Sequence, residues 1–158
     1  MGVTVQRIER PEDAAYCMPL LREFFKDTRQ AQFTELNEEA VEALLQSLIE
    51  DVTRGAVFVA IEDRQLIGVT GAMLYPLWFS PQYLTGQEMF WYVAKDRRKT
   101  KAGKKLFQAL EDWAKEQGAS SFSMMSLSHL DEKRVAQMYA SKGYVPSERT
   151  YIKEFTQE

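Results

Sequence analysis

The stretch EMFWYVAKDRRKTKAGKK at residues 88–105 decides the fold of this chain. Its first part, 88–94, is aromatic and apolar, which is typical of a strand. The next eleven residues, 95–105, carry seven Lys or Arg and one Asp, for a net charge of +6. Apolar residues at helical spacing then predict a helix from about Gly103 to Gln117. The sequence therefore predicts a strand that leads through a basic loop into a helix.

The basic loop is unusual because the whole chain is acidic. The chain has 20 Lys and Arg and 23 Asp and Glu, a formal charge of −3, so the 147 residues outside 95–105 sum to −9. A helix start adds unpaired N–H groups and roughly half a positive charge, and Gly103 lets backbone approach a ligand closely. Together these features are typical of a phosphate site. A solvated basic loop and a nucleic-acid patch are the alternatives.

Composition narrows the function classes further. No aromatic residues interleave with the basic ones as stacking platforms, and the sequence pI of about 5.4 is far from that of a nucleic-acid-binding domain. One Cys and one His exclude a cysteine-rich zinc site and a multi-His metal centre. No run reaches the ~18 apolar residues of a membrane span, and the first residues lack the apolar core of a signal peptide. We therefore expect a cytoplasmic protein.

The remaining sequence predicts one α/β domain over residues 1–158, with 45% apolar residues. Pro19 predicts a kink or a second start in the first helix, and Asn37 can cap the second. Residues 75–87 hold two Pro, one Gly and four aromatics and predict a long loop. Strands are expected at 3–8, 56–62, 65–74, 88–94 and 120–127, helices at 11–27, 37–50, 103–117 and up to about 141, and two short strands within 144–155.

Two motifs carry a family resemblance. The stretch from Arg98 to Gly103 reads RKTKAG, and the stretch from Tyr139 to Tyr144 reads YASKGY. They resemble the pyrophosphate loop, (Arg/Gln)-x-x-Gly-x-(Gly/Ala), and the Tyr-x-x-x-Gly-(Phe/Tyr) segment of the GNAT superfamily of N-acetyltransferases, which use acetyl-CoA. Lys101 stands where the family has its middle Gly. Both motifs lie in the predicted elements where the family has them.

This resemblance implies the acyl-CoA N-acyltransferase fold, a central, mostly antiparallel sheet of six to seven strands flanked by about four helices. The sheet would splay between its fourth strand, 88–94, and its fifth, 120–127. The pantetheine arm of acetyl-CoA would bind the main chain of the fourth strand, and the basic loop would hold the phosphates, while Lys105 points elsewhere. The resemblance assigns cofactor binding to Trp91, Tyr92, Val93, Arg98, Lys99, Lys101, Ala102, Gly103 and Lys104.

Acetyl transfer from a thioester to an amine needs a base for the amine proton and an acid for the departing thiolate. By resemblance, Tyr139 is the candidate acid, and its hydroxyl, with a reference pKa of about 10, is protonated at neutral pH. Glu88, which we expect to open the fourth strand, is the candidate base. The alternatives are a core aromatic at Tyr139 and an exposed strand-end carboxylate at Glu88. His129 is a further candidate base because of its pKa range.

The resemblance thus implies an acetyl-CoA-dependent N-acetyltransferase that acts on a primary amine by direct transfer through a tetrahedral intermediate, without a metal or a membrane partner. The alternatives are a non-catalytic CoA-binding sensor of the same fold and an anion- or nucleic-acid-binding module built on residues 95–105. The acceptor is open, and so is the oligomeric state, although family relatives are often dimers. The aromatics of residues 75–87 either pack over a sheet end or form a wall for the amine. Cys17 is expected in the core.

Overall fold

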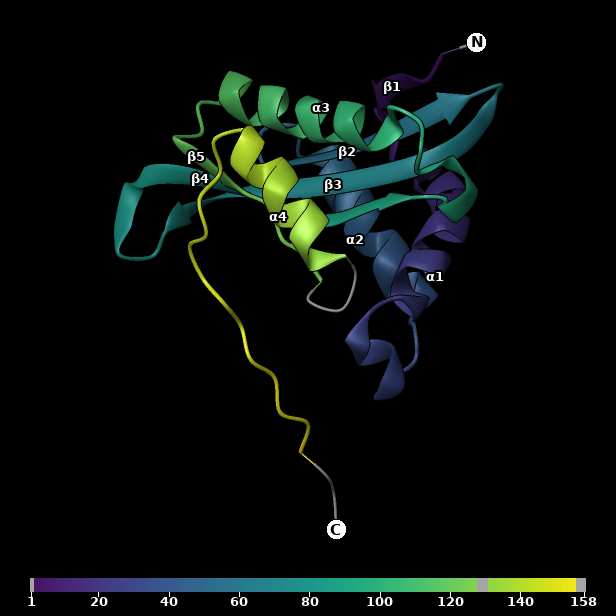
Figure 1. Cartoon of the computed structure of the whole chain (residues 1–158). Coiled ribbons are helices and arrows are strands. Elements are labelled where there is room, and N and C mark those ends of the chain that lie inside the picture. The colour runs from purple at the N-terminus through teal and green to yellow at the C-terminus, as the bar shows by residue number, and fades with distance from the viewer. Residues whose placement is uncertain (1, 128–130, 156–158) are drawn as a thin grey trace.

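The computed structural model of the chain describes residues 2–127 and 131–155. These residues form one sheet of five strands in the spatial order β1-β2-β3-β4-β5 (Figure 1). The first four strands pair antiparallel, and β5 pairs parallel to β4. The α/β class and the mostly antiparallel sheet are confirmed, with five strands where six to seven were predicted. The strands are β1 (Thr4–Arg7), β2 (Gly55–Glu62), β3 (Gln65–Leu77), β4 (Ser80–Val93) and β5 (Ser121–Ser123).

The helices follow the predicted positions, with one division. The helix expected over 11–27 divides before Pro19, because proline lacks an N–H group and fits only the first turn of a helix. Asn37 caps the next helix as expected, since its side-chain oxygen accepts a hydrogen bond from the Ala40 N–H at 3.0 Å. The described helices are η1 (Pro11–Cys17), α1 (Met18–Lys26), η2 (Arg29–Gln32), α2 (Glu38–Glu50), η3 (Lys95–Arg97), α3 (Ala102–Glu116) and α4 (Glu132–Ser141), where η marks a 3-10 helix.

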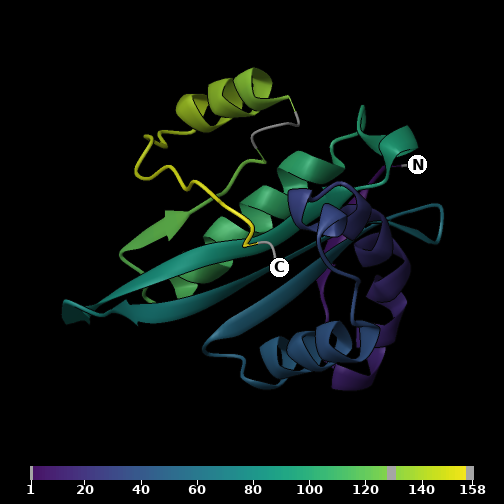
Figure 2. The same ribbon diagram turned by 90° about the horizontal axis from the view of Figure 1, so that it is seen from below.

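Helices cover both faces of the sheet (Figures 1 and 2). α1 and α2 pack on one face, in a core cluster that includes Phe90 and Tyr92 of β4. α3 packs on the other face, in a cluster that includes Val93 and has Trp91 against it. This division follows from the alternation of side chains along a strand. The end of β4 is therefore held from both sides, which determines where the basic loop leaves the sheet.

The loop predicted over 75–87 is wrong. β3 runs to Leu77 and β4 begins at Ser80, so the two strands form a long hairpin whose tip holds Trp78 and Phe79. Pro76 is tolerated because the pairing of β3 with β2 stops at Met73, which lies opposite Gly55, the first residue of β2. Beyond that point no strand of the described residues lies on this side of β3, so proline costs no sheet hydrogen bond there. Turn-favouring residues can thus lie within β3 and β4 here because β2 no longer pairs with β3.

The strands predicted within 144–155 are absent from the described residues. This segment is extended and makes no strand pairing, and it leads from the end of α4 away from the sheet (Figure 1). β5 is also shorter than expected, Ser121–Ser123 instead of 120–127. The two strands missing from 144–155 account for the lower strand count in the described residues. None of the helices in residues 2–127 and 131–155 combines the length and the apolar character that crossing a bilayer requires.

Candidate active site

A β-bulge in β4 marks the centre of the candidate site. Gly71 of β3 is opposite Phe90, but the next residue, Ala72, is opposite Glu88, so Met89 is an extra residue in β4. A bulge of this kind bends a strand and changes the direction of its side chains. The pairing of β4 with β5 also ends here, at Gln87 and Ser123. Two irregularities of the sheet therefore coincide at one residue, Glu88.

Glu88 lies in the middle of β4 and not at its start, and it is buried, with 4% of its surface exposed. Glu88 therefore does not open the strand as expected, and the alternative of an exposed strand-end carboxylate is wrong. Its partner Ala72 packs in the core cluster beside α3, and directly opposite residues share a face of the sheet, so Glu88 faces α3. Burial disfavours the charged form and raises the pKa of Glu88 to about 8. This carboxyl group changes protonation state near neutral pH.

Tyr139 comes to the same face from α4. Its hydroxyl donates a hydrogen bond to the carbonyl oxygen of Met125 at 2.5 Å, and its ring lies 5.7 Å from Phe107 and 6.3 Å from Trp91 between centroids. Burial raises the pKa of Tyr139 above its usual value, and the nearby charge of Glu88 raises it further. The phenol is therefore neutral at physiological pH and can donate a proton. The structure brings together the two residues predicted as base and acid.

Trp91, Tyr92 and Val93 lie beyond the end of the β4–β5 pairing. They pair with β3 on one side, and within the described residues their other edge has no strand beside it. On that side no strand competes with an extended ligand for their main chain, although the Val93 carbonyl oxygen already accepts a hydrogen bond from Arg98. The Trp91 ring also contacts the start of α3, because its Nε1–H donates to the Gly103 carbonyl oxygen at 3.1 Å.

Arg98, a predicted phosphate ligand, makes several contacts within the fold. Its Nε–H donates to the Val93 carbonyl oxygen at 3.0 Å, its guanidinium lies 5.2 Å from the Tyr92 ring, and it pairs with Asp27 at 3.7 Å. Lys95 also pairs with Asp27, at 3.5 Å. Arg98 therefore holds the basic loop against β4 and the end of α1 and does not extend freely toward a phosphate.

The free cations are further along the loop. Lys99, Lys101 and Lys104 are exposed, and no hydrogen bond or ion pair joins their side chains to residues 2–127 or 131–155. Lys105 points elsewhere, as expected, and its Nζ donates to the carbonyl oxygen of Val3 at 2.7 Å. A solvent-facing group of three lysines is suited to a polyanionic ligand.

The first turn of α3 has free backbone donors. The Ala102 N–H donates to the Thr100 hydroxyl oxygen at 3.2 Å. The N–H groups of Gly103 and Lys104 make no hydrogen bond within the described residues. Free N–H groups at a helix start favour an anion. These donors and the free lysines lie on one continuous segment of chain.

α4 is attached to the fold through aromatic and polar contacts that the sequence did not reveal. None of its residues is fully buried. Just beyond its end, Tyr144 donates to the Glu111 carboxylate on α3 at 2.9 Å, and its ring lies 6.0 Å from Tyr139 and 5.3 Å from Phe107. Glu111 follows Phe107 by four residues, the spacing of neighbours on one helix face, which is the only hint of this contact in the sequence. Tyr144 and Glu111 thus position Tyr139.

Tyr144→Phe tests this attachment. The loss of the hydrogen bond to Glu111 is expected to cost about 1 kcal/mol of stability and to lower turnover several-fold through Tyr139, with the affinity for acetyl-CoA unchanged. Thermal unfolding and steady-state kinetics measure the two effects. Tyr75→Phe is the matched control, because it removes a phenol that bonds to Gln87 at 3.1 Å within the β3–β4 hairpin. Full turnover in Tyr144→Phe would mean that the hydrogen bond between Tyr144 and Glu111 does not position Tyr139 for catalysis.

His129 and Cys17 are the remaining residues that the sequence singled out. His129 lies outside the described residues. Cys17 is in the core as expected, and burial raises the pKa of its thiol to about 12, so it is not a nucleophile at neutral pH.

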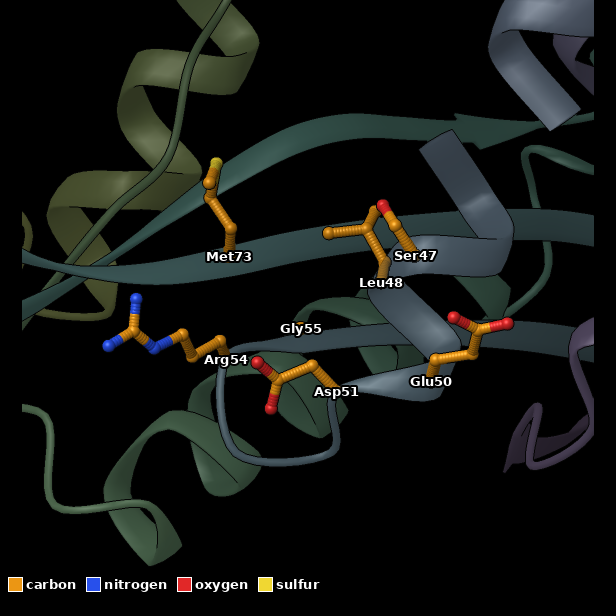
Figure 3. A pocket seen from close by; sticks show the side chains of 7 residues that line it. All are labelled: Ser47, Leu48, Glu50, Asp51, Arg54, Gly55 and Met73. Carbon is orange, nitrogen blue, oxygen red and sulfur yellow. The ribbon is translucent and has the colours of Figure 1, made fainter. Parts of the chain in front are cut away.

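The surface cavities lie away from Glu88 and Tyr139. One of about 560 Å³ is between α1, η2 and the start of α2. Another, of about 400 Å³, lies where α2 turns into β2 (Figure 3). Asp51 in this cavity already accepts hydrogen bonds from the N–H and hydroxyl of Thr53, so its carboxylate stabilises the turn. None of the predicted site residues is among the lining residues, which are Ser47, Leu48, Glu50, Asp51, Arg54, Gly55 and Met73.

Comparison of its sequence with family models shows the family to which this chain belongs. The family model of the acetyltransferase (GNAT) family matches residues 18–144, which is 127 of the 158 residues. The chain therefore belongs to the GNAT acetyltransferase family. Among curated proteins, no sequence matches the chain.

Solved structures share the fold at low sequence identity. A ribosomal-protein-alanine N-acetyltransferase from Brucella melitensis biovar Abortus 2308 has a TM-score of 0.70 and 19% identity, with 98% of this chain and 100% of that chain covered. An aminoglycoside acetyltransferase from an uncultured soil metagenomic sample has 0.73 and 19%, covering 99% and 100%. Glucosamine-6-phosphate N-acetyltransferase from Arabidopsis thaliana has 0.73 and 16%, also covering 99% and 100%. At these low identities, the similarity shows only that the fold is shared.

Proposed function

We propose that the protein is an acetyl-CoA-dependent N-acetyltransferase that acetylates a primary amine by direct transfer. The observation that carries this proposal is the juxtaposition of Glu88 and Tyr139 beside the open edge of β4. A carboxyl group with a pKa of about 8 can accept a proton when it is ionised, and a neutral phenol can donate one, as a general base and a general acid must.

The reaction follows from these two groups. Glu88, when ionised, takes a proton from the ammonium form of the acceptor, since only the neutral amine has a lone pair. The amine nitrogen attacks the thioester carbonyl carbon, and the new C–N bond gives a tetrahedral intermediate. The C–S bond then breaks as the C=O bond re-forms, and the departing thiolate takes the proton of the Tyr139 hydroxyl. The nitrogen gives its second proton to the resulting tyrosinate, which leaves the neutral amide and restores the phenol. The hydroxyl must first leave its hydrogen bond to the Met125 carbonyl oxygen.

The basic segment supplies the binding of acetyl-CoA in this proposal. The N–H groups of Gly103 and Lys104 and the side chains of Lys99, Lys101 and Lys104 would hold the phosphates. A lysine at 101 contributes a charge where the family motif has a glycine. Arg98 holds the loop against β4 and the end of α1 through its contacts with Val93 and Asp27.

The binding step is tested by calorimetric titration with acetyl-CoA. Wild-type protein should bind, and Lys101→Glu should bind about tenfold more weakly, a difference of about 1.4 kcal/mol. Lys115→Glu is the matched control, because it makes the same charge change on an exposed lysine at the far end of α3. Equal affinities for acetyl-CoA in all three proteins would mean that the basic loop does not bind it.

Thiol release across a panel of amines tests the catalytic step. If the protein bound acetyl-CoA but released no CoA thiol with any amine, the CoA-binding sensor would be the correct interpretation. A preference for DNA, weakening steeply with salt, would favour the nucleic-acid module instead.

A further inference from the structure

The face of the sheet on which α2 packs is not covered by a helix along the β3–β4 hairpin. α2 packs on β2 at Gly55, where an added Cβ atom would lie 2.7 Å from the Leu48 Cα. Gly55 is opposite Met73, which is opposite Gln87. Gln87 is opposite Ser123, and directly opposite residues share a face of the sheet. α1 and α2 lie over one end of the sheet, and the hairpin extends beyond them (Figure 2).

Two further residues belong to this uncovered surface. The Tyr75 hydroxyl donates a hydrogen bond to Gln87 Oε1 at 3.1 Å, and Gln87 Nε2 lies 3.6 Å from the Met125 sulfur. Met73 and Met125 are 39% and 45% exposed. We call this surface the hairpin face, and it consists of Met73, Tyr75, Gln87, Ser123 and Met125.

The hairpin face borders the two proposed reacting groups. Gln87 directly precedes Glu88, and the Met125 carbonyl oxygen accepts the hydrogen bond from Tyr139. Glu88 and Tyr139 lie on the other face, beside α3 and α4, where the proposed function places acetyl-CoA. The pairing of β4 with β5 ends at Gln87, so the two faces meet at this point of the sheet. An acceptor amine therefore reaches Glu88 from the hairpin face.

The hairpin face carries no charged side chain. Residues 65–87 contain no Asp, Glu, Lys, Arg or His, and the first charged residue after them is Glu88. The thioethers of Met73 and Met125 are apolar and adapt to the shape of a ligand. Tyr75 and Gln87 bond to each other and offer no charge. An ammonium group placed on this surface would lose hydration without gaining an anionic partner.

Charged residues do line the cavity that Met73 shares with the end of α2 (Figure 3). They are Glu50, Asp51 and Arg54. The Asp51 carboxylate already accepts hydrogen bonds from Thr53, and the positive charge of Arg54 offsets one of the two carboxylates. This cavity therefore does not supply the strong negative charge that a polycationic acceptor needs.

We propose that the acceptor is a primary amine with a single ammonium group on an uncharged, apolar body, and that this body binds on the hairpin face. The inference rests on the proposed function, because it takes Glu88 as the group that receives the amine proton. The apolar body leaves water against Met73 and Met125, and its one ammonium group meets the carboxyl group of Glu88. Polyamines and aminoglycosides, with several ammonium groups, are disfavoured on the same surface.

Thiol release with pentylamine and with cadaverine tests the acceptor class. The two amines have the same carbon chain, and cadaverine differs only by a second amino group at the far end. The wild type should show a kcat/KM about tenfold higher for pentylamine, although cadaverine has more amino groups to react. A neutral peptide with one free amino terminus carries the same chemistry as pentylamine. Its kcat/KM beside that of pentylamine distinguishes a protein source from a small amine.

Met73→Glu tests whether the hairpin face sets this preference. It places a carboxylate on the face at an exposed position, so kcat/KM should rise for cadaverine and fall for pentylamine. Met73→Gln is the matched control, because it has the same length without the charge, and it should keep the wild-type order of the two amines. Equal or faster reaction of the wild type with cadaverine, or the same order of amines in Met73→Glu and Met73→Gln, overturns the acceptor class and leaves the N-acetyltransferase in place. Absence of thiol release with every amine overturns the proposed function itself, and this inference with it.

Discussion

Glu88→Gln is expected to lower turnover by about 100-fold and to remove the rise in rate that the wild type shows near pH 8. The base acts only when ionised, and its pKa of about 8 means that the wild-type rate increases with pH up to that region and then levels off. A primary amine acceptor also gains its neutral form with increasing pH, but that limb belongs to the substrate and remains in the variant. The pH–rate profiles of the two proteins, measured with one amine, separate the two limbs.

Stability gives an independent reading of the same carboxyl group. Its pKa in the folded protein, about 8, is above its reference value of 4.5, so ionisation is less favourable in the folded state. The wild type should therefore lose stability as pH rises from 4.5 to about 8, by up to about 1.4 kcal/mol for each pH unit. Glu88→Gln cannot ionise and should be more stable than the wild type at pH 9. Thermal unfolding at pH 5 and pH 9 checks this.

The matched control is Glu39→Gln, which makes the same change on an exposed residue of α2. It should keep both the activity and the wild-type dependence of stability on pH. If Glu88→Gln retained full rate and an unchanged pH profile, the proton of the amine would have another acceptor and the proposed base would be wrong.

Local patterns predicted the parts of the fold that depend on local physics. The Asn37 cap and the break before Pro19 are present. The strands expected at 56–62 and 65–74 leave two residues between them, Asp63 and Arg64, and these have the left-handed φ angles of 50° and 65° that a two-residue hairpin requires. Each depends on hydrogen bonds or sterics within a few residues. The strand–loop–helix stretch is confirmed for the same reason.

The failures arise where distant residues decide the outcome. Residues 75–87 look like a loop because proline and glycine break strands in general, yet Pro76 lies where β3 has already lost its neighbour β2. Arg98 matches a ligand-binding motif, but Asp27, the residue just after a helix some seventy residues earlier, also pairs with it. Nothing within either stretch reports these neighbours.

The same limit applies to the site. The resemblance proposed Glu88 as the base and Tyr139 as the acid, while the sequence left an exposed strand-end carboxylate as the alternative for Glu88. The β-bulge at Met89 and the cover provided by α3 bury it and thereby give it a pKa suited to a base. Tyr144 and Glu111, which hold α4 in place, belong to elements that pack together only in the folded chain.

Tyr139→Phe is expected to lower kcat by about 100-fold while leaving the affinity for acetyl-CoA nearly unchanged. The phenol is neutral because burial and the charge of Glu88 raise its pKa, so the wild type holds a proton ready for the thiolate over the whole physiological range. Phenylalanine keeps the ring contacts with Phe107 and Trp91 and removes only the donor. Steady-state kinetics and titration with acetyl-CoA measure the two quantities.

Two comparisons make this prediction specific to the proton. The variant also loses the hydrogen bond to the Met125 carbonyl oxygen, which should cost about 1 kcal/mol of stability and far less than 100-fold in rate. Tyr75→Phe loses a similar bond and should keep its rate. Because the acid serves the leaving group, an acyl donor whose thiol has a lower pKa should need it less, and the loss in Tyr139→Phe should shrink with such a donor. An equal loss with both donors would mean that the hydroxyl positions the site and does not protonate the thiolate.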